Sequence, residues 1–228
     1  MRASDESSKN DSPRMTHEPK TRRGQASRER IIAGAADLVG ERGVHGASLD
    51  DVLSAAGASK SQLYHYFRDK EDLVRAVVAR QTARVLAAQM PLLDELDSWA
   101  AITAWFDTLV GLQDQRGCVG GCPIGSLASE LADHDEAARR DLAASFDRWE
   151  GYLARGLARM RERGALDDRA DPATLAMAVM ASIQGGLLLT QTRKTSRPLR
   201  VALDAAMIYL RDFAMSDLST RPPPPTDA

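Results

Sequence analysis

The sequence predicts an all-α protein with an N-terminal three-helix domain, which contains a helix-turn-helix, and a C-terminal helical domain. Two observations support this fold class. Ala, Leu, Arg, Glu and Asp dominate the 228 residues while β-branched residues are sparse, a composition that favours helix. Apolar residues recur at helical spacing, and no segment combines strand-like alternation with hairpin signals. The chain is long enough to bury a substantial core in one or two domains.

The composition along the chain predicts four segments. The N-terminus is polar and charged, and the C-terminus contains four consecutive prolines, so both ends are expected to be disordered. The expected segments are a tail over 1–24, a helix-turn-helix domain over 25–70, a larger ligand-binding and dimerisation domain over 71–216, and a tail over 217–228.

The first helix is expected to begin at Ser27. Ile31, Ala35 and Leu38 form one apolar stripe, and Gly43 is placed to end the helix. This stripe can pack against the apolar residues of the next helix to form a small core.

The stretch from 48 to 72 contains three helix starts. Each has an N-cap side chain followed three residues later by a side chain that can reciprocate, namely Ser48 with Asp51, Ser59 with Gln62, and Asp69 with Asp72. Gly57 supplies the stop between the first two helices. Two short helices joined by a tight turn form a helix-turn-helix.

The second helix of this pair has two different faces. Leu63, Tyr66 and Phe67 form the inner one, and the outer one carries hydrogen-bond donors, a cation and aromatic tips. Such side chains suit the phosphates and base edges of a DNA major groove. An ordinary helical hairpin, or one used for protein contact, shows similar caps and a similar polar face.

Two stretches of this region resemble the TetR family of bacterial transcriptional regulators. They are Ala56–Leu73, with the run Ser-Lys-Ser-Gln-Leu-Tyr-His-Tyr-Phe, and the upstream pattern Ile31–Gly43. One departure is Tyr66, where many members carry His. The resemblance implies a regulator that binds DNA and carries a ligand pocket in its second domain.

Charge is distributed unevenly along the chain. The net charge is −2, yet residues 20–84 contain 12 Lys and Arg against 8 Asp and Glu, whereas residues 85–228 contain 15 against 20. A net +4 around the helix-turn-helix favours phosphate, and the acidic remainder repels it.

The residues of this region are assigned two roles on DNA. Ser48, Lys60, Tyr64 and Lys70 are expected to position phosphates, and Ser59, Ser61, Gln62 and His65 are the candidates for base edges. The basic end of the tail, 20–23, is either a solvated segment or an arm that reaches the adjacent minor groove.

Six further helices are expected after the helix-turn-helix. Their limits follow from N-cap residues, from prolines and from glycines. They run from Asp69 to before Pro91, from Ser98 to about Gln115, from Pro123 to Leu131, from about 136 to Gly164, from Pro172 to Arg193, and from Pro198 to Phe213.

The last two of these helices are apolar over much of their circumference, so they are expected to be buried. They lie either at the centre of one domain or against a second copy. Because one seven-residue recognition helix contacts few bases, two helices related by a two-fold axis suit half-sites ~34–36 Å apart. The resemblance also implies a homodimer through these helices, with a palindromic double-stranded operator as partner.

A set of large apolar side chains in the second domain could line a ligand cavity, although a packed core is the favoured explanation for any single one of them. The set comprises Trp105, Phe106, Phe146, Trp149, Tyr152, Met177 and Met180. The segment Gly121–Glu130 resembles the LmrA/YxaF-like branch of the family, which is linked to drug or plant-phenol responses. A small hydrophobic or aromatic effector is therefore expected.

Cys122 is expected at the N-cap before Pro123, where helix N–H groups would lower its pKa and favour thiolate. This predicts a redox or electrophile sensor, with Cys118 as the resolving thiol. The alternatives are a small buried hydrophobe and, from another class, a thiol-dependent enzyme on a helical scaffold.

No enzyme, metal or cofactor motif stands out. The sequence lacks Gly-x-Ser-x-Gly, a phosphate loop and Gly-x-Gly-x-x-Gly, and two Cys with a distant His134 do not match a zinc site. No hydrophobic signal segment and no run of ~18 apolar residues are found, so we expect a cytoplasmic protein without a membrane partner. The prediction is a DNA-binding regulator, most simply a repressor released by its effector, and not an enzyme.

Overall fold

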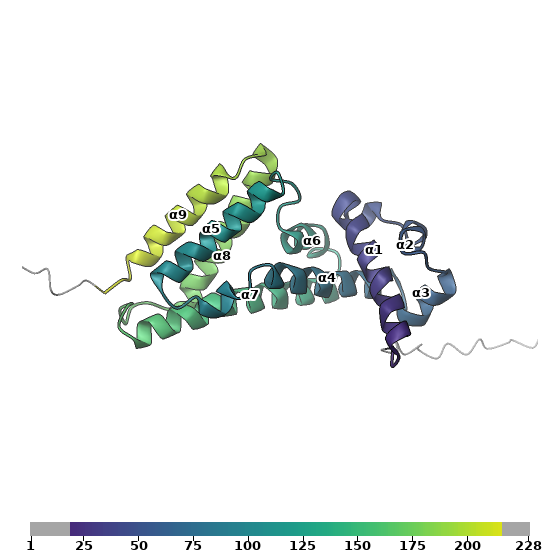
Figure 1. Ribbon diagram of the computed structural model, residues 1–228, viewed down its shortest axis with the longest axis horizontal. Coiled ribbons are helices and arrows are strands. Elements are labelled where there is room, and N and C mark those ends of the chain that lie inside the picture. The colour runs from purple at the N-terminus through teal and green to yellow at the C-terminus, as the bar shows by residue number, and fades with distance from the viewer. Residues whose placement is uncertain (1–18, 216–228) are drawn as a thin grey trace, which may run out of the picture. The chain divides into compact units, whose positions relative to one another are not determined.

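The computed structural model describes residues 19–215, and these form nine α-helices and one 3-10 helix (Figure 1). The described part contains no strand, only an isolated bridge between Leu166 and Ala214. The chain divides into two compact units between Val77 and Val78. Residues 1–18 of the N-terminal tail expected over 1–24, and the whole C-terminal tail expected over 217–228, lie outside the described residues.

The first unit contains three helices and the beginning of a fourth. Its elements are α1 (Arg22–Gly46), α2 (Leu49–Ala56), α3 (Lys60–Tyr66) and the first turns of α4 (Lys70–Ala87). α1 packs against both α2 and α3. The three-helix arrangement expected from the sequence is confirmed.

The start of α1 differs from the prediction. Thr21 is its N-cap, and the threonine hydroxyl accepts a 3.1 Å hydrogen bond from the Gly24 N–H, so the helix begins at Arg22 and not at Ser27. Residues 22–24 were expected in the disordered tail and are helical. Gly43 breaks the helical geometry with a φ of 74°, as predicted, because a left-handed backbone is accessible to glycine.

The caps of the helix-turn-helix form as the sequence predicts, with one exception. Ser48 and Ser59 each complete a capping box, and Gly57 ends α2 with a φ of 56°. Asp69 accepts from the Asp72 N–H at 2.7 Å. The Asp72 carboxylate, however, accepts from the Arg68 N–H and not from that of Asp69.

The core of the first unit forms where these helices meet. Leu63 and Phe67 are buried, as expected, and Tyr66 is buried beside them. The Arg28 guanidinium lies 5.2 Å from the centre of the Phe67 ring, a cation–π arrangement. α3 has only seven residues and would not be stable alone, so this packing fixes its outer face in space.

The second unit contains the remaining helices. After the end of α4 these are η1 (Leu92–Glu95), α5 (Trp99–Gln115), α6 (Pro123–Leu131), α7 (Glu136–Glu162), α8 (Pro172–Arg193) and α9 (Arg197–Arg211). α8 packs along α7 and α9, and α6 packs on α7. Ser98, Cys122, Asp135 and Asp171 are side-chain N-caps, so local sequence sets most of these helix starts.

α8 is long and apolar enough, by length and composition alone, to cross a membrane, although the sequence was expected to hold no run of ~18 apolar residues. Within this unit, however, Val179 and Ile183 are fully buried, and a Cβ on Gly186 would lie 2.9 Å from Leu199 of α9. One side of α8 is therefore a packed core surface.

The opposite sides of α8 and α9 are exposed on the single chain, so these helices are not buried all round within one domain, and the expected alternative, burial against a second copy, stays a prediction. The large apolar residues exposed there are Met177, Leu188, Leu189, Val201, Ile208 and Tyr209. We call this surface the α8/α9 outer face. Gly185 lies on it, and a Cβ added to this glycine would meet no atom within 4 Å, so the face is also open to close approach.

Candidate functional site

The outer side of α3 presents a group of exposed polar side chains. Leu63, Tyr66 and Phe67 hold the helix from inside, so the remaining positions face solvent. The exposed residues are Lys60, Ser61, Gln62, Tyr64 and His65. This is the face expected from the sequence to contact DNA.

Two of the residues assigned to base edges also hold the helix start. The Gln62 Oε1 accepts from the Ser59 N–H at 2.8 Å, and the Ser59 hydroxyl accepts from the Gln62 N–H at 3.2 Å. The capping box thus orients the Gln62 side chain before any ligand binds, and its amide Nε2 remains available as a donor.

Two of the residues assigned to phosphates are engaged within the protein. The Ser48 hydroxyl donates to the Asp51 carboxylate at 2.6 Å, a bond that lowers the pKa of Asp51. The Lys70 Nζ donates to the Val44 carbonyl at 2.9 Å, which fastens the start of α4 to the end of α1. Lys60 and Tyr64 are exposed on α3.

The basic residues at the start of α1 are exposed. Arg22 and Arg23 lie in its first turn, and Lys20 directly precedes the cap. The two arginines are helical, so the expected minor-groove arm cannot include them in an extended form. They add positive charge to this unit.

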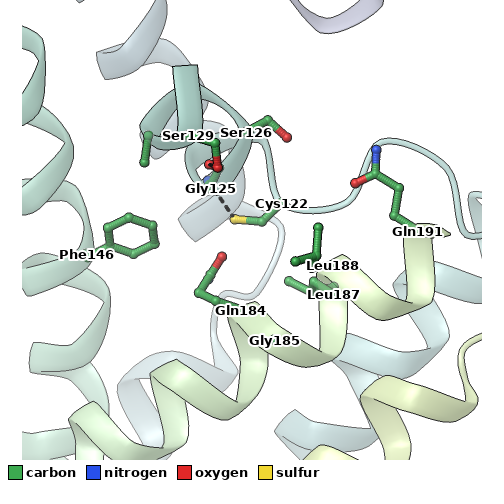
Figure 2. Close-up of a pocket in the computed structure, with 11 residues that line it drawn as sticks. Cys122, Gly125, Ser126, Ser129, Phe146, Gln184, Gly185, Leu187, Leu188 and Gln191 are labelled. Atoms are coloured by element: carbon green, nitrogen blue, oxygen red, sulfur yellow. Dashed lines mark hydrogen bonds between the residues drawn. The ribbon is translucent and has the colours of Figure 1, made fainter. Parts of the chain in front are cut away.

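The second unit contains a cavity of about 360 Å³ between α6, α7 and α8 (Figure 2). Its lining combines apolar surface with neutral polar groups. It includes Cys122, Ser126, Ser129, Phe146, Gln184, Leu187, Leu188 and Gln191. The volume falls at the lower end of the ~300–1,000 Å³ typical of small-molecule sites.

Two glycines leave space for the side chains of the two glutamines that line this cavity. A Cβ on Gly125 would lie 2.8 Å from Gln184 Oε1, and one on Gly121 would overlap Gln191 Oε1. The glycines after α5 and in α6 therefore let the amides of α8 lie against the backbone.

Cys122 is the N-cap of α6, as expected, and its Sγ accepts from the Gly125 N–H at 3.4 Å. Its pKa, however, is raised and not lowered. Burial of the thiol is the largest cause, and it outweighs the hydrogen bonds from Gly125, Ile124 and Gln184. Cys118 is also buried and free. The expected lowering of the Cys122 pKa is therefore wrong, because burial outweighs the effect of the helix N-terminus.

The seven apolar residues predicted to bind ligand are dispersed. Phe146 lines the 360 Å³ cavity, and Trp149 lines a second cavity of about 40 Å³. Trp105, Phe106 and Met180 are buried core residues. Tyr152 is half-buried beneath Arg155, and Met177 is exposed on the α8/α9 outer face.

Several cavity residues were not singled out from the sequence. Ser126, Ser129, Gln184 and Gln191 are ordinary polar residues of helices, and only the packing of α6 on α7 and α7 on α8 brings them together. A polar residue inside the apolar stretch of α8 was the one available signal, and Gln184 has that position.

Family models match both units of the chain. Residues 31–77 match the N-terminal model of the bacterial regulatory proteins of the tetR family, and residues 98–205 match the C-terminal domain of LmrA/YxaF-like transcriptional regulators. Together they include α2, α3 and the cavity residues.

Individual relatives and a solved structure point to the same family as the two family models. The regulator YxaF of Bacillus subtilis is 28% identical over 193 residues, covering 84% of this chain and 98% of that protein. A regulator in the lacX 3′ region of Lactococcus lactis is 30% identical over 168 residues, covering 72% and 82%. The crystal structure of reduced Escherichia coli NemR superposes with a TM-score of 0.71 at 25% identity, covering 83% and 98%. The chain is a DNA-binding transcriptional regulator and not an enzyme, and it belongs to the TetR family.

Proposed function

We propose that a homodimer of this chain represses transcription from a palindromic operator and leaves it when a small, largely apolar effector fills the 360 Å³ cavity. The observation that carries this proposal is the position of α8. Gly185 and Leu188 line the cavity, and both belong to the α8/α9 outer face. An effector that moves these residues would therefore act on the surface that a second copy would cover.

The composition of the α8/α9 outer face favours a second copy as its partner. Leu188, Val201 and Ile208 are 63%, 58% and 68% exposed on the single chain. Apolar patches of this kind mark interaction surfaces, and a two-fold axis buries the same patch on both partners. A dimer also places two α3 helices on one operator, which compensates for the few bases that one short helix contacts.

The repressor assignment rests on relatives. NemR of Escherichia coli and DhaR of a Mycobacterium species are named transcriptional repressors, and they are 27% and 25% identical to this chain. The protein would then act in the cytoplasm, where the DNA lies. On the DNA, Lys60 and Tyr64 would position phosphates together with Ser48 and Lys70, and Ser61, Gln62 and His65 would contact base edges with Ser59.

The effector would act by shifting the equilibrium between two arrangements of the dimer. α4 runs from Lys70 to Ala87 and so continues from the first unit into the second. A ligand that favours one arrangement of the second unit changes the position of α4, and the two α3 helices then no longer match successive major grooves. A thiol sensor is not proposed, because burial raises the pKa of Cys122.

The test begins with selection of bound fragments from the source genome, followed by fluorescence anisotropy on the selected operator with and without candidate effectors. We expect salt-dependent binding that an effector weakens at least tenfold. Ser129→Phe would place a ring in the cavity and abolish the response while leaving operator binding intact. Ala143→Phe, at an exposed position of α7 outside the cavity, is the matched control. An effector that saturates the protein without changing operator affinity would refute the proposal.

A further inference from the structure

The two short helices of the helix-turn-helix begin with capping boxes that differ in one respect. In α2 the reciprocating residue is Asp51, whose carboxylate accepts from the Ser48 hydroxyl at 2.6 Å and lies 3.7 Å from the Arg42 guanidinium. In α3 it is Gln62, whose Oε1 accepts from the Ser59 N–H at 2.8 Å. A carboxylate offers no hydrogen-bond donor, whereas an amide carries two N–H bonds on its nitrogen. The box of α3 therefore retains a donor that the box of α2 lacks.

The orientation of the Gln62 amide follows from chemistry as well as from geometry. A backbone N–H donates and an amide nitrogen does not accept, so the atom that bonds to the Ser59 N–H must be the oxygen. The Nε2 group lies on the other arm of the amide and donates to no other residue in the described part of the chain. Gln62 is exposed on the outer side of α3, so this nitrogen is available to DNA.

The neighbours of this amide also present donors. The Ser59 hydroxyl accepts from the Gln62 N–H at 3.2 Å, and its own hydrogen is not used within the described residues. The Lys60 ammonium, which is exposed beside it, has donors only. Ser61 and His65 can accept as well as donate. Gln62 is therefore the residue whose choice of base is restricted by the capping box.

An amide side chain recognises adenine with both of its polar atoms. The oxygen accepts from adenine N6 while the nitrogen donates to N7, so the two atoms must lie side by side against the base. In α3 the Gln62 oxygen is turned back to the Ser59 backbone nitrogen, 2.8 Å away. Adenine would require release of this bond, which weakens the start of a seven-residue helix and lowers affinity about fivefold.

A donor without a neighbouring acceptor matches the bases that carry a keto group in the major groove. Guanine presents O6 and N7 there and thymine presents O4, and all three atoms accept. Cytosine and adenine present an amino group instead, which would place two donors against each other. We propose that Gln62 selects a guanine or a thymine in each half-site of the operator, with its bond to Ser59 intact. The inference rests on the proposed function, because it specifies a base that the operator must contain.

The donor is positioned before DNA binds. Leu63, Tyr66 and Phe67 are at most 8% exposed and hold α3 from inside, and the capping bond holds the amide of Gln62 on this helix. A side chain that is already fixed loses little rotamer freedom on binding. Rotation of the amide to suit an amino-bearing base would break the capping bond, so the preference is part of the folded protein.

The experiment selects bound duplexes from a randomised library with the full-length parent protein and with Gln62→Glu. The parent should enrich guanine or thymine at one position of each half-site. Glutamate can still accept from the Ser59 N–H but presents only acceptors to DNA, so the preference at this position should change to cytosine or adenine. The other positions should keep their bases, although the added negative charge weakens binding to all duplexes.

Two control variants assign the preference to Gln62. Asp51→Asn makes the corresponding exchange of acid and amide in the capping box of α2, and it should leave the selected bases unchanged. Lys60→Met removes the neighbouring exposed donor without altering the box of α3. It should weaken binding to all duplexes and keep the keto base. Thermal melts of the variants check that each of them is folded.

Base analogues in the selected operator test the bond itself with the parent protein. Where the base is thymine, uracil keeps O4 and should bind within about twofold, whereas 5-methylcytosine replaces O4 with an amino group and should bind about tenfold more weakly. Where it is guanine, 2-aminopurine lacks O6 and should also bind about tenfold more weakly. Hydrogen exchange of the Ser59 N–H should stay slow in the operator complex, because its bond to Gln62 is kept.

Three results would each overturn the inference: an unchanged base preference with Gln62→Glu, tolerance of the amino-bearing analogues by the parent protein, or fast exchange of the Ser59 N–H in the complex. If the glutamate variant binds no duplex, the analogues and the exchange measurement decide alone. If the keto base is found but no effector releases the operator, the proposed function fails and this assignment stands. If effectors release an operator whose bases do not depend on Gln62, the proposed function stands and this assignment fails.

Discussion

The Thr82 hydroxyl of α4 donates a 2.9 Å hydrogen bond to the Ser145 hydroxyl of α7, at a buried contact between the two helices. Ser145 donates in turn to the Asp141 carbonyl at 2.7 Å. The Thr82 hydroxyl also lies 2.9 Å from the Val78 carbonyl of its own helix, so without Ser145 it still has an acceptor, whereas without Thr82 the buried Ser145 oxygen has no donor.

Thr82→Val should therefore lower the free energy of unfolding by about 1 kcal/mol, since the isosteric side chain leaves the Ser145 oxygen without its donor. Denaturant titration measures the change. Thr108→Val is the control, because the exposed Thr108 hydroxyl bonds only to the Ala104 carbonyl of its own helix. Adding Ser145→Ala to Thr82→Val should cost less than the sum of the two single changes, and strict additivity would contradict the coupling.

Gly156→Ala should destabilise the second unit by about 3 kcal/mol, because the new Cβ would overlap the Leu96 carbonyl oxygen and force two backbone segments apart. Gly111→Ala offers the opposite case. That glycine lies inside α5 with nothing within 4 Å, so alanine should stabilise the protein by up to ~1 kcal/mol through helix propensity. Thermal melts of both variants check the sign of each change.

Gln62→Glu should separate the structural and DNA-binding roles of this residue. A carboxylate oxygen can still accept from the Ser59 N–H, so the melting temperature should stay within a few degrees of the parent. Operator affinity should fall at least tenfold, because an amide donor is lost and a negative charge faces the phosphates. Gln62→Ala should lose both stability and affinity. Tight operator binding by the Glu variant would exclude Gln62 from the DNA contact.

Ile208→Glu should weaken the dimer at least 100-fold, because it buries an unpaired carboxylate at the α8/α9 outer face. Sedimentation velocity at micromolar concentration should then show a monomer. Val119→Glu, at another exposed apolar residue, in the loop before α6, should leave the dimer intact. If both variants sediment as the parent does, the dimer does not use this face.

Cys122 should react slowly with iodoacetamide at pH 7.5 in the folded protein and rapidly after denaturation, because burial raises its pKa. Peptide mapping by mass spectrometry distinguishes it from Cys118. The folded state holds the thiol proton more tightly than the unfolded chain. The corresponding stability is complete below the ordinary thiol pKa of ~8.5 and is lost as pH rises toward the folded value. Rapid modification at pH 7.5 without unfolding would restore the sensor hypothesis.

The sequence by itself determined the helices and the helix-turn-helix. Ser48, Gly57 and Ser59 act through bonds to residues three or four positions away, so their roles are visible in the sequence. The exposed side of α3 followed in the same way, because Leu63 and Phe67 define its inner face at helical spacing. Thr21 is a local signal of the same kind, although the apolar pattern predicts Ser27 as the start of α1.

Only the tertiary structure decided which groups share an environment. From the sequence, the helix start at Cys122 predicts a lowered thiol pKa. In the folded protein, desolvation of the thiol by burial outweighs that effect and raises the pKa. Met177 and Met180 are alike in sequence, yet one is exposed on the outer face and the other is buried. Gln113 of α5 and Trp149 of α7 line the same small cavity, and no local pattern encodes that they lie there together. Capping energies act within one turn of a helix, whereas burial and cavities arise from residues far apart in the chain.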